Sequence, residues 1–200
     1  MSTIFETEVF TFDELSDEAK EKAREWYREG ALDYEWWDGV YDTAKTAGAC
    51  LGIDVDKIYF SGFWSQGDGA CFTGSYAYRK GWRKALKAEF GGDAYARLTT
   101  IGEALQAVQK PAFYKLAASV RHTGNSTHEY STTIDVDTRD MPETGDRVDE
   151  EALKYALRDF MRWIYRQLEA EHDWLMADEQ VDESIRANEY TFTESGKRFG

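Results

Sequence analysis

The sequence is poor in the residues that cross-link or interrupt a chain. Its 200 residues include only two cysteines and two prolines, so we expect neither a disulfide framework nor a cysteine-rich metal site. No apolar run approaches the about 18 residues that suggest a membrane span, and the first residues lack the basic and apolar regions of a secretory signal. These absences indicate a reducing cytoplasm without membrane attachment, with Cys50 and Cys71 as small core or half-buried residues.

The composition is that of a folded protein. Hydrophobic residues make up 42% of the chain and aromatic residues 15%, with seven Trp and twelve Tyr, which is more than a disordered chain carries. A chain of this length buries about 70% of its unfolded surface without cross-links. No internal repeat is present, and the most linker-like stretch, residues 139–147, is too short to separate two domains. We therefore predict a single domain over residues 1–200.

The spacing of apolar residues and glycines predicts helices alternating with pairs of strands. One β-hairpin is expected around the turn Gln66-Gly67-Asp68-Gly69 and another around Gly124-Asn125, because Gly, Asp and Asn favour tight turns. The expected strands are 3–11, 57–65, 70–79, 113–122, 128–137, 190–193 and 197–199. The expected helices are 16–30, with Ser16 as its N-cap, 33–47, 80–90, 101–109, 149–174 and 178–187. Strands that come as hairpins favour an α+β fold, in which helices pack mainly on one face of an antiparallel sheet.

Charge is the most uneven property of the sequence. The net charge of −14 divides into −8 over residues 1–45, +2 over 46–139, −10 over 140–195 and +2 over the last five residues. Both ends of the chain are therefore acidic, and the centre is nearly neutral. A chain of this sign repels nucleic acid at long range, so we expect no direct nucleic-acid binding.

The acidic residues offer one candidate site, an interaction face for a basic partner. Its members are Glu169, Glu171, Asp173, Asp178, Glu179, Asp182 and Glu183. Such residues either serve solubility alone or imitate the charge of DNA on one continuous face. The opposite charge gathers in a basic cluster, which would be a solvated helix face, a nucleic-acid contact or a partner for an acidic helix: Arg79, Lys80, Arg83, Lys84 and Lys87.

The stretch from Ser61 to Phe72 offers the second candidate site, a loop that binds a ligand or a partner. Gly62 interrupts a predicted strand, which often marks a bulge or a close approach. The candidate residues are Ser61, Trp64, Ser65, Gln66, Asp68 and Cys71. A tight turn without function is the alternative. The string lacks the spaced oxygen ligands of a calcium loop and has no catalytic partner at a recognisable spacing, so we assign no catalytic residue, metal or cofactor.

Three segments resemble a family of uncharacterised proteins of tailed bacteriophages and prophages, some of which are labelled antitoxin-like. They are TFDELSDEAKEKAREWYREG (11–30), FSGFWSQGDGACF (60–72) and NEYTFTESGKRF (188–199). The string FSGFxSQGDGA is the most specific of them. The resemblance implies a small accessory protein made in the cytoplasm of an infected bacterium, and it brings no activity or site residues with it.

These observations predict a binding protein rather than an enzyme. We expect it to inhibit or redirect a host protein or protein complex, as anti-CRISPR and anti-restriction proteins do, through its acidic residues. The alternative is a protein that binds a small molecule or nucleotide, or an enzyme, using the Ser61–Phe72 loop. No membrane partner is expected, and a homodimer is plausible because aromatic residues are abundant and sheet edges are expected.

Overall fold

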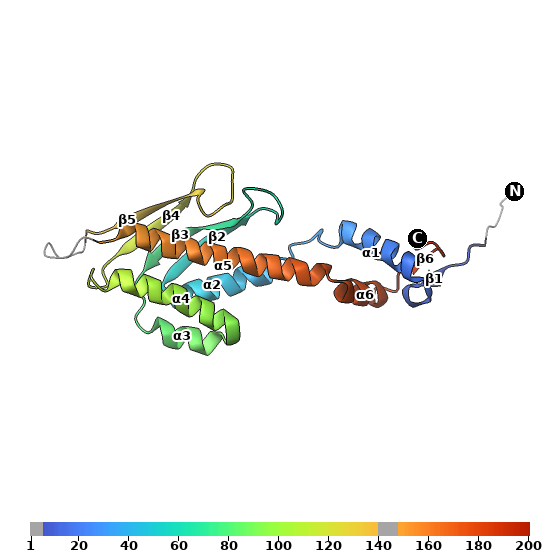
Figure 1. Cartoon of the computed structure of the whole chain (residues 1–200), viewed down its shortest axis with the longest axis horizontal. Coiled ribbons are helices and arrows are strands. Elements are labelled where there is room, and N and C mark those ends of the chain that lie inside the picture. The colour runs from blue at the N-terminus through green and yellow to red at the C-terminus, as the bar shows by residue number, and fades with distance from the viewer. Residues whose placement is uncertain (1–5, 140–147) are drawn as a thin grey trace. The chain divides into compact units, whose positions relative to one another are not determined.

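The computed structural model describes residues 6–139 and 148–200 and has an α+β fold, as the sequence predicts. The chain groups into two compact units (Figure 1). The larger unit comprises residues 37–169, and the smaller unit comprises residues 1–36 and 170–200. Each unit has its own sheet. Whether the two unfold together is a question of stability, so the single domain over residues 1–200 stays a prediction.

The larger unit is built on a four-stranded antiparallel sheet. Its strands β2 (Ile53–Phe60), β3 (Ala70–Ala77), β4 (Ala117–His122) and β5 (Thr132–Asp137) lie in chain order. β2 with β3 and β4 with β5 form the two predicted hairpins, and β3 pairs with β4 between them. Each strand pairs with its neighbour in the chain. Both hairpin loops, residues 61–69 and 123–131, therefore lie at the same end of the sheet.

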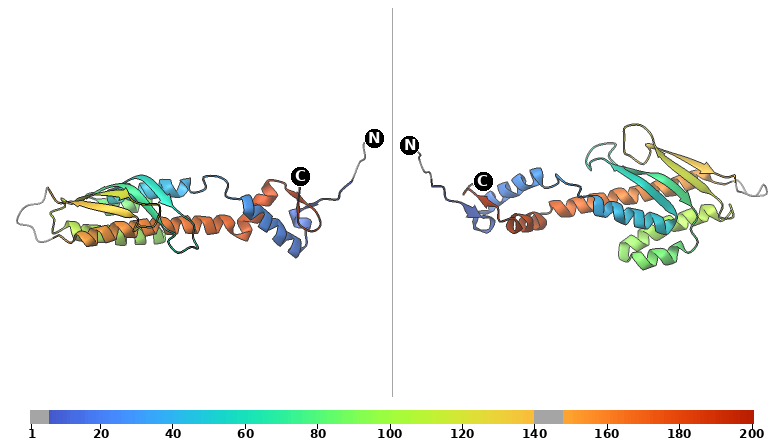
Figure 2. Two further views of the ribbon diagram at one scale, coloured as in Figure 1. Left: turned by 90° about the horizontal axis from the view of Figure 1, so that it is seen from above. Right: turned by 180° about the vertical axis from the view of Figure 1, so that it is seen from behind.

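Four helices complete this unit: α2 (Asp38–Leu51), α3 (Trp82–Glu89), α4 (Gly92–Gln109) and α5 (Glu150–Met176), the last of which supplies residues 170–176 to the smaller unit. α5 runs along one face of the sheet (Figure 2), where the ring of Phe160 meets Phe72 of β3 at 5.8 Å between centroids. Buried and exposed residues alternate along β4, so the opposite face of the sheet is exposed along this strand. The predicted one-sided packing is confirmed.

The core of the larger unit depends on close approach and on one buried polar residue. A Cβ on Gly102 of α4 would lie 2.4 Å from the ring of Trp82, so glycine is what admits this indole of α3. Gln109, at the end of α4, is fully buried. Its amide donates to the Leu116 carbonyl at 2.7 Å and accepts from the Leu116 amide at 3.1 Å, which satisfies the backbone of the turn into β4.

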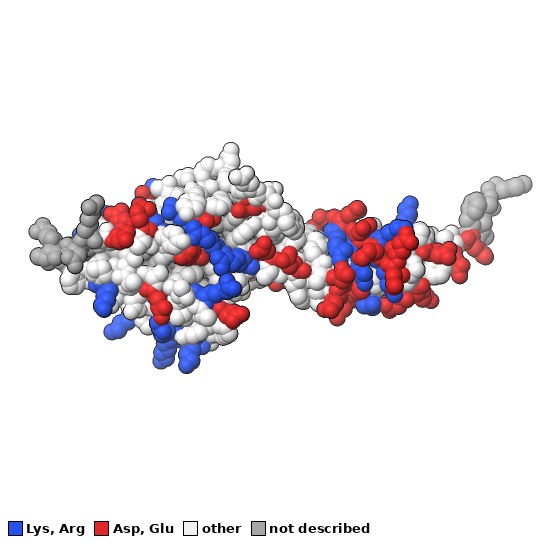
Figure 3. All heavy atoms as spheres, in the orientation of Figure 1, with Lys and Arg blue, Asp and Glu red and all other residues white. Residues whose placement is uncertain are grey.

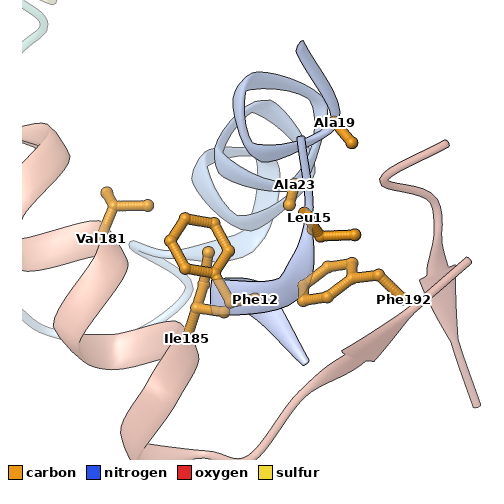
Figure 4. Close-up of a cluster of buried hydrophobic side chains, with 7 residues drawn as sticks. All are labelled: Phe12, Leu15, Ala19, Ala23, Val181, Ile185 and Phe192. Atoms are coloured by element: carbon orange, nitrogen blue, oxygen red, sulfur yellow. The ribbon is translucent and has the colours of Figure 1, made fainter. Parts of the chain in front are cut away.

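The smaller unit is assembled from both ends of the chain. It contains β1 (Phe10–Thr11), the 3₁₀ turn η1 (Phe12–Glu14), α1 (Asp17–Gly30), α6 (Asp178–Ala187), β6 (Thr191–Phe192) and β7 (Arg198–Phe199). The order of its sheet is β1-β6-β7. Figure 4 shows its apolar cluster, which joins η1, α1, α6 and β6: Phe12, Leu15, Ala19, Ala23, Val181, Ile185 and Phe192.

Two local features fix the start of α1 and its close packing against the terminal hairpin. The Ser16 side chain accepts a hydrogen bond from the Ala19 amide, which confirms the predicted N-cap. Gly196, in the turn between β6 and β7, has φ +82°, and a Cβ there would lie 2.1 Å from the Ala19 carbonyl oxygen. Only glycine allows this turn to lie so close to the helix.

Several predicted elements differ from the structure. β2 spans Ile53–Phe60 rather than 57–65, and β4 and β5 each begin four residues later than predicted, at Ala117 and Thr132. Of the strand expected over 3–11, residues 3–5 lie outside the described residues, and only Phe10–Thr11 is strand. α2 begins at Asp38 rather than near residue 33, because residues 31–37 form turns. α4 begins at Gly92 rather than at residue 101, since the Gly91-Gly92 pair separates two helices without a long loop. Residues 140–147 of the linker-like stretch also lie outside the described residues.

Candidate functional site

The predicted loop between β2 and β3 is closed by its own aspartate. The Asp68 carboxylate accepts hydrogen bonds from the backbone amides of Ser65 at 2.7 Å and Trp64 at 3.1 Å. The Asp68 amide in turn donates to the Ser65 carbonyl at 3.0 Å. An aspartate that binds its own backbone in this way holds a turn, and these bonds use one carboxylate oxygen. Asp68 is therefore positioned as a structural residue of the loop.

Two further contacts hold the loop in place. The Ser61 hydroxyl accepts from the Thr127 hydroxyl at 2.8 Å, which ties the loop to the neighbouring loop 123–131. The Tyr165 hydroxyl of α5 donates to the Gly62 carbonyl at 3.0 Å. Gln66 is exposed, and Trp64 is 79% exposed. The structure thus brings these loop residues together in a fixed turn, and Trp64, Ser65 and Gln66 are the predicted site residues that face solvent.

Cys71 has to be removed from this candidate site. It lies in β3, paired in register with Tyr59 of β2, and its side chain is fully buried. Burial raises the pKa of the thiol to about 11, so the thiolate that would act as a nucleophile is disfavoured. The loop ends two residues earlier than the predicted site. Cys50 is buried too, and both cysteines are free, as the sequence indicates.

The acidic residues of α6 are divided between an internal interface and solvent. Asp182 accepts from Arg24 of α1 through both carboxylate oxygens, at 2.7 and 2.8 Å. Asp178 pairs with Arg28, whose guanidinium also donates to the Met176 carbonyl. The hydrogen bond from Arg24 lowers the pKa of Asp182, and Asp182 raises that of Arg24. Asp178 and Asp182 therefore join α6 to α1. This corrects the assignment of Asp182 to a face for a partner, whereas Asp178 remains exposed.

The other predicted acidic residues do not form such pairs with arginine. Glu179 and Glu183 of α6 are exposed, and neither makes an ion pair among the described residues. Asp173 is exposed beside His172 at 3.6 Å, and Glu171 is half-buried. Glu169 belongs to the larger unit. The predicted set thus contributes a smaller number of solvent-facing carboxylates than the sequence suggests.

α1 supplies acidic residues that the sequence analysis did not include in the face. Four exposed carboxylates recur every four residues along it, which places them in one row: Asp17, Glu21, Glu25 and Glu29. Figure 3 shows Asp and Glu side chains over much of the visible surface of α1 and α6, with Lys and Arg between them. The four-residue spacing was present in the sequence, but the pairing of α1 with α6 was not visible there.

The two units differ sharply in charge. The smaller unit has nineteen acidic and seven basic residues, a net charge of −12, and the larger unit has nineteen acidic and seventeen basic residues, a net charge of −2.

In the basic cluster, Arg79 donates to the Ala49 carbonyl and Arg83 pairs with Glu103 of α4. At least these two residues have intramolecular partners, which supports the reading of this cluster as a solvated helix face.

A second group of basic residues escaped the sequence analysis. Tyr130, 61% exposed in loop 123–131, lies under the guanidinium of Arg158 at 4.8 Å from its ring centroid. Arg162 donates to the buried carboxylate of Glu129 at 2.8 Å and to Asp159 at 2.6 Å. The signal was the four-residue spacing of Arg158, Arg162 and Arg166 on the long helix, which places three arginines on one side of α5.

The described residues include no group of three or more His, Cys, Asp and Glu side chains placed to hold a metal ion. None of the helices within residues 6–139 and 148–200 is long and apolar enough to cross a membrane. Two surface features remain as candidates for binding. One is the loop 61–69 of the larger unit, which exposes Trp64, and the other is the carboxylate-rich surface of α1 and α6 in the smaller unit.

The comparisons with known proteins place the chain in a family. Residues 36–178 match the family described as Domain of unknown function (DUF8835), and the protein belongs to that family. The match covers the whole larger unit and ends at the first residue of α6. No curated protein and no solved structure matches the chain.

Proposed function

We propose that this protein acts by binding, and that the carboxylate-rich surface of its smaller unit occupies a basic surface on a protein partner. The difference in net charge between the units, −12 against −2, is the observation that supports this proposal. Charge spread for solubility alone would not need to concentrate in one unit. Concentrated charge of one sign steers a partner of the opposite sign and fixes its orientation.

The smaller unit also exposes aromatic residues of the kind that binding surfaces favour. Trp174 and Tyr34, both in the smaller unit, are 53% and 57% exposed. Trp and Tyr contribute large contact areas at little cost in side-chain entropy and are enriched where binding energy concentrates. Exposed carboxylates and exposed aromatic residues in one unit suit a partner whose basic surface normally contacts nucleic acid. With the resemblance to phage proteins, the partner is a host machine, such as a defence nuclease, in the bacterial cytoplasm.

The test is affinity purification from a bacterial lysate with three versions of the full-length chain. One is the natural sequence, and one carries Glu179→Lys and Glu183→Lys on α6. The matched control carries Glu89→Lys and Asp93→Lys, two exposed acids of the larger unit without an ion pair among the described residues. We expect a specific partner with the natural chain and the control and its loss with the α6 reversal.

Salt provides the second readout. Raising NaCl from about 0.1 M to about 1 M shortens the Debye length from about 10 to about 3 Å, so an electrostatically steered partner elutes. A partner that survives both the α6 reversal and high salt contradicts the proposal. If it is instead lost with Gln66→Ala or Trp64→Ala, the loop between β2 and β3 is the binding site.

A further inference from the structure

The strongest unassigned feature of the larger unit is a small cavity between α4 and α5. Its volume is about 190 Å³, and its wall is formed by six residues: Arg97, Thr100, Ile101, Asp159, Trp163 and Arg166. Drug-sized ligands need pockets of about 300–1,000 Å³, so this cavity fits a single chemical group. It lies away from the loop between β2 and β3 in the sequence and belongs to no site described above.

The wall contains a buried donor without an acceptor. Trp163 is 3% exposed, and its indole Nε1 has no hydrogen-bond partner among the described residues. A buried N–H without an acceptor costs about 1–3 kcal/mol, and native structures rarely leave one. An indole N–H only donates, so the missing partner is an acceptor. The unpaired indole N–H of Trp163 therefore indicates a ligand with acceptor oxygens.

Two arginines in the same wall define the charge of that ligand. Arg97 of α4 and Arg166 of α5 are exposed, and neither forms an ion pair among the described residues. The acidic member, Asp159, already accepts from Arg162 at 2.6 Å. The lining therefore carries a net charge of +1. Figure 3 shows basic side chains gathered over this stretch of the larger unit along α5.

We propose that the cavity between α4 and α5 binds a phosphate group, with Arg97 and Arg166 holding its oxygens and the Trp163 indole donating to one of them. Guanidinium groups bind phosphate through paired N–H donors. Donors that come from two helices suit a tetrahedral oxyanion better than a planar carboxylate. The proposal concerns the larger unit alone and is independent of the acidic surface of the smaller unit.

The test follows the indole signal of Trp163 by ¹H–¹⁵N NMR of the full chain, assigned with Trp163→Phe. Inorganic phosphate is added at constant ionic strength, with NaCl as the balancing salt. We expect a saturable shift of this one indole signal at millimolar phosphate. Arg97→Gln and Arg166→Gln should each weaken binding by about tenfold, the effect of losing one charged contact. The matched control, Lys84→Gln on the exposed side of α3, should leave the affinity unchanged.

Other probes identify the source of the phosphate. Adenosine monophosphate that binds more tightly than inorganic phosphate indicates a phosphorylated small molecule, and a short oligothymidylate that binds more tightly indicates a nucleic-acid backbone. Both outcomes support the site. Acetate that binds as well as phosphate contradicts the oxyanion class. An indole signal that does not move, or that moves equally in the Arg97→Gln/Arg166→Gln double variant, overturns the proposal.

A melting measurement covers the case in which Trp163→Phe does not fold. Phosphate should raise the Tm of the natural chain relative to chloride at equal ionic strength, because a ligand that binds only the folded state stabilises it. The rise should disappear in the double variant, whose substitutions are on exposed side chains. An equal rise in both proteins would overturn the proposal.

Discussion

The two units of this protein differ in what stabilises each of them internally. The larger unit buries a broad apolar face between a four-stranded sheet and α5, with Phe160 fully buried against Phe72. The smaller unit has a cluster of seven buried apolar residues, two of them alanines, and adds the pair between Arg24 and Asp182. Both units contain a partly buried ion pair, since Arg162 of the larger unit binds Glu129. The comparison teaches that such a pair is a minor addition to the broad apolar core of the larger unit and a main helix-to-helix contact in the smaller one.

The largest expected effect concerns the apolar core of the larger unit. Phe160→Ala removes a fully buried ring and should lower the free energy of unfolding by about 3–5 kcal/mol. Native-state hydrogen exchange should show this loss at the slowest amides of β3 and α5. The exposed Tyr155→Ala is the control.

The same variant decides whether the units are independent. Amides of α1 and α6 should keep their exchange rates if the smaller unit opens by itself, since separate cooperative units open with their own free energies. An equal loss of protection in both units would show instead that residues 1–200 unfold as the single domain that the sequence predicts.

The next effect concerns the charged interface of the smaller unit. Asp182→Asn weakens the bonds to Arg24 and should cost about 1–3 kcal/mol there at neutral pH. Arg24 lowers the pKa of Asp182, so the natural pair stabilises the fold above the unfolded pKa of about 3.9 and loses this contribution as pH falls through the lower folded pKa.

The measurement is hydrogen exchange of α1 and α6 amides between about pH 5 and pH 2. The difference between the natural chain and Asp182→Asn should be constant above pH 4 and shrink below it. Lys22→Ala, which removes an exposed pair with Glu18, should change stability by no more than about 0.5 kcal/mol. A difference that grows on acidification would contradict the assigned role of Asp182.

The smallest expected effect concerns the loop between β2 and β3. Asp68→Ala removes the acceptor of the Trp64 and Ser65 amides, which should cost about 1 kcal/mol locally. These two amides should exchange faster, by about fivefold to tenfold, while the core amides of β2 and β3 remain unchanged. Gln66→Ala serves as the control. Unchanged exchange at Trp64 and Ser65 would show that other contacts hold the loop.

The sequence predicts some local elements well, where the signal is periodic or a turn or cap residue marks the end. The stripe that includes Phe160 and Ile164 predicts α5 to within two residues of its observed ends, Glu150 and Met176. Gly67 and Gly124, both with positive φ, mark the two hairpin turns. The Ser16 cap predicts the start of α1. In each case the information lies within a few residues of the element.

Pairings between distant residues could not be predicted in the same way. Arg24 and Asp182 are 158 positions apart, and no local pattern shows that these two charges meet while Glu25 and Glu183 face solvent. The cavity at Trp163 also needs two helices in place before its wall exists. The sequence gives the net charge of each end of the chain. It does not show which charged residues form ion pairs inside the folded unit.

The assembly of the smaller unit from both termini has a consequence for synthesis. α1 leaves the ribosome early, but Val181, Ile185 and Phe192, which complete its apolar cluster, are added more than 150 residues later. At about 5–20 residues per second this delay is roughly 8–30 s. During that time the Ala19–Ala23 side of the nascent helix has Phe12 and Leu15 of its cluster but lacks the side chains of α6 and β6. A chaperone that binds short apolar stripes could bind it in this interval.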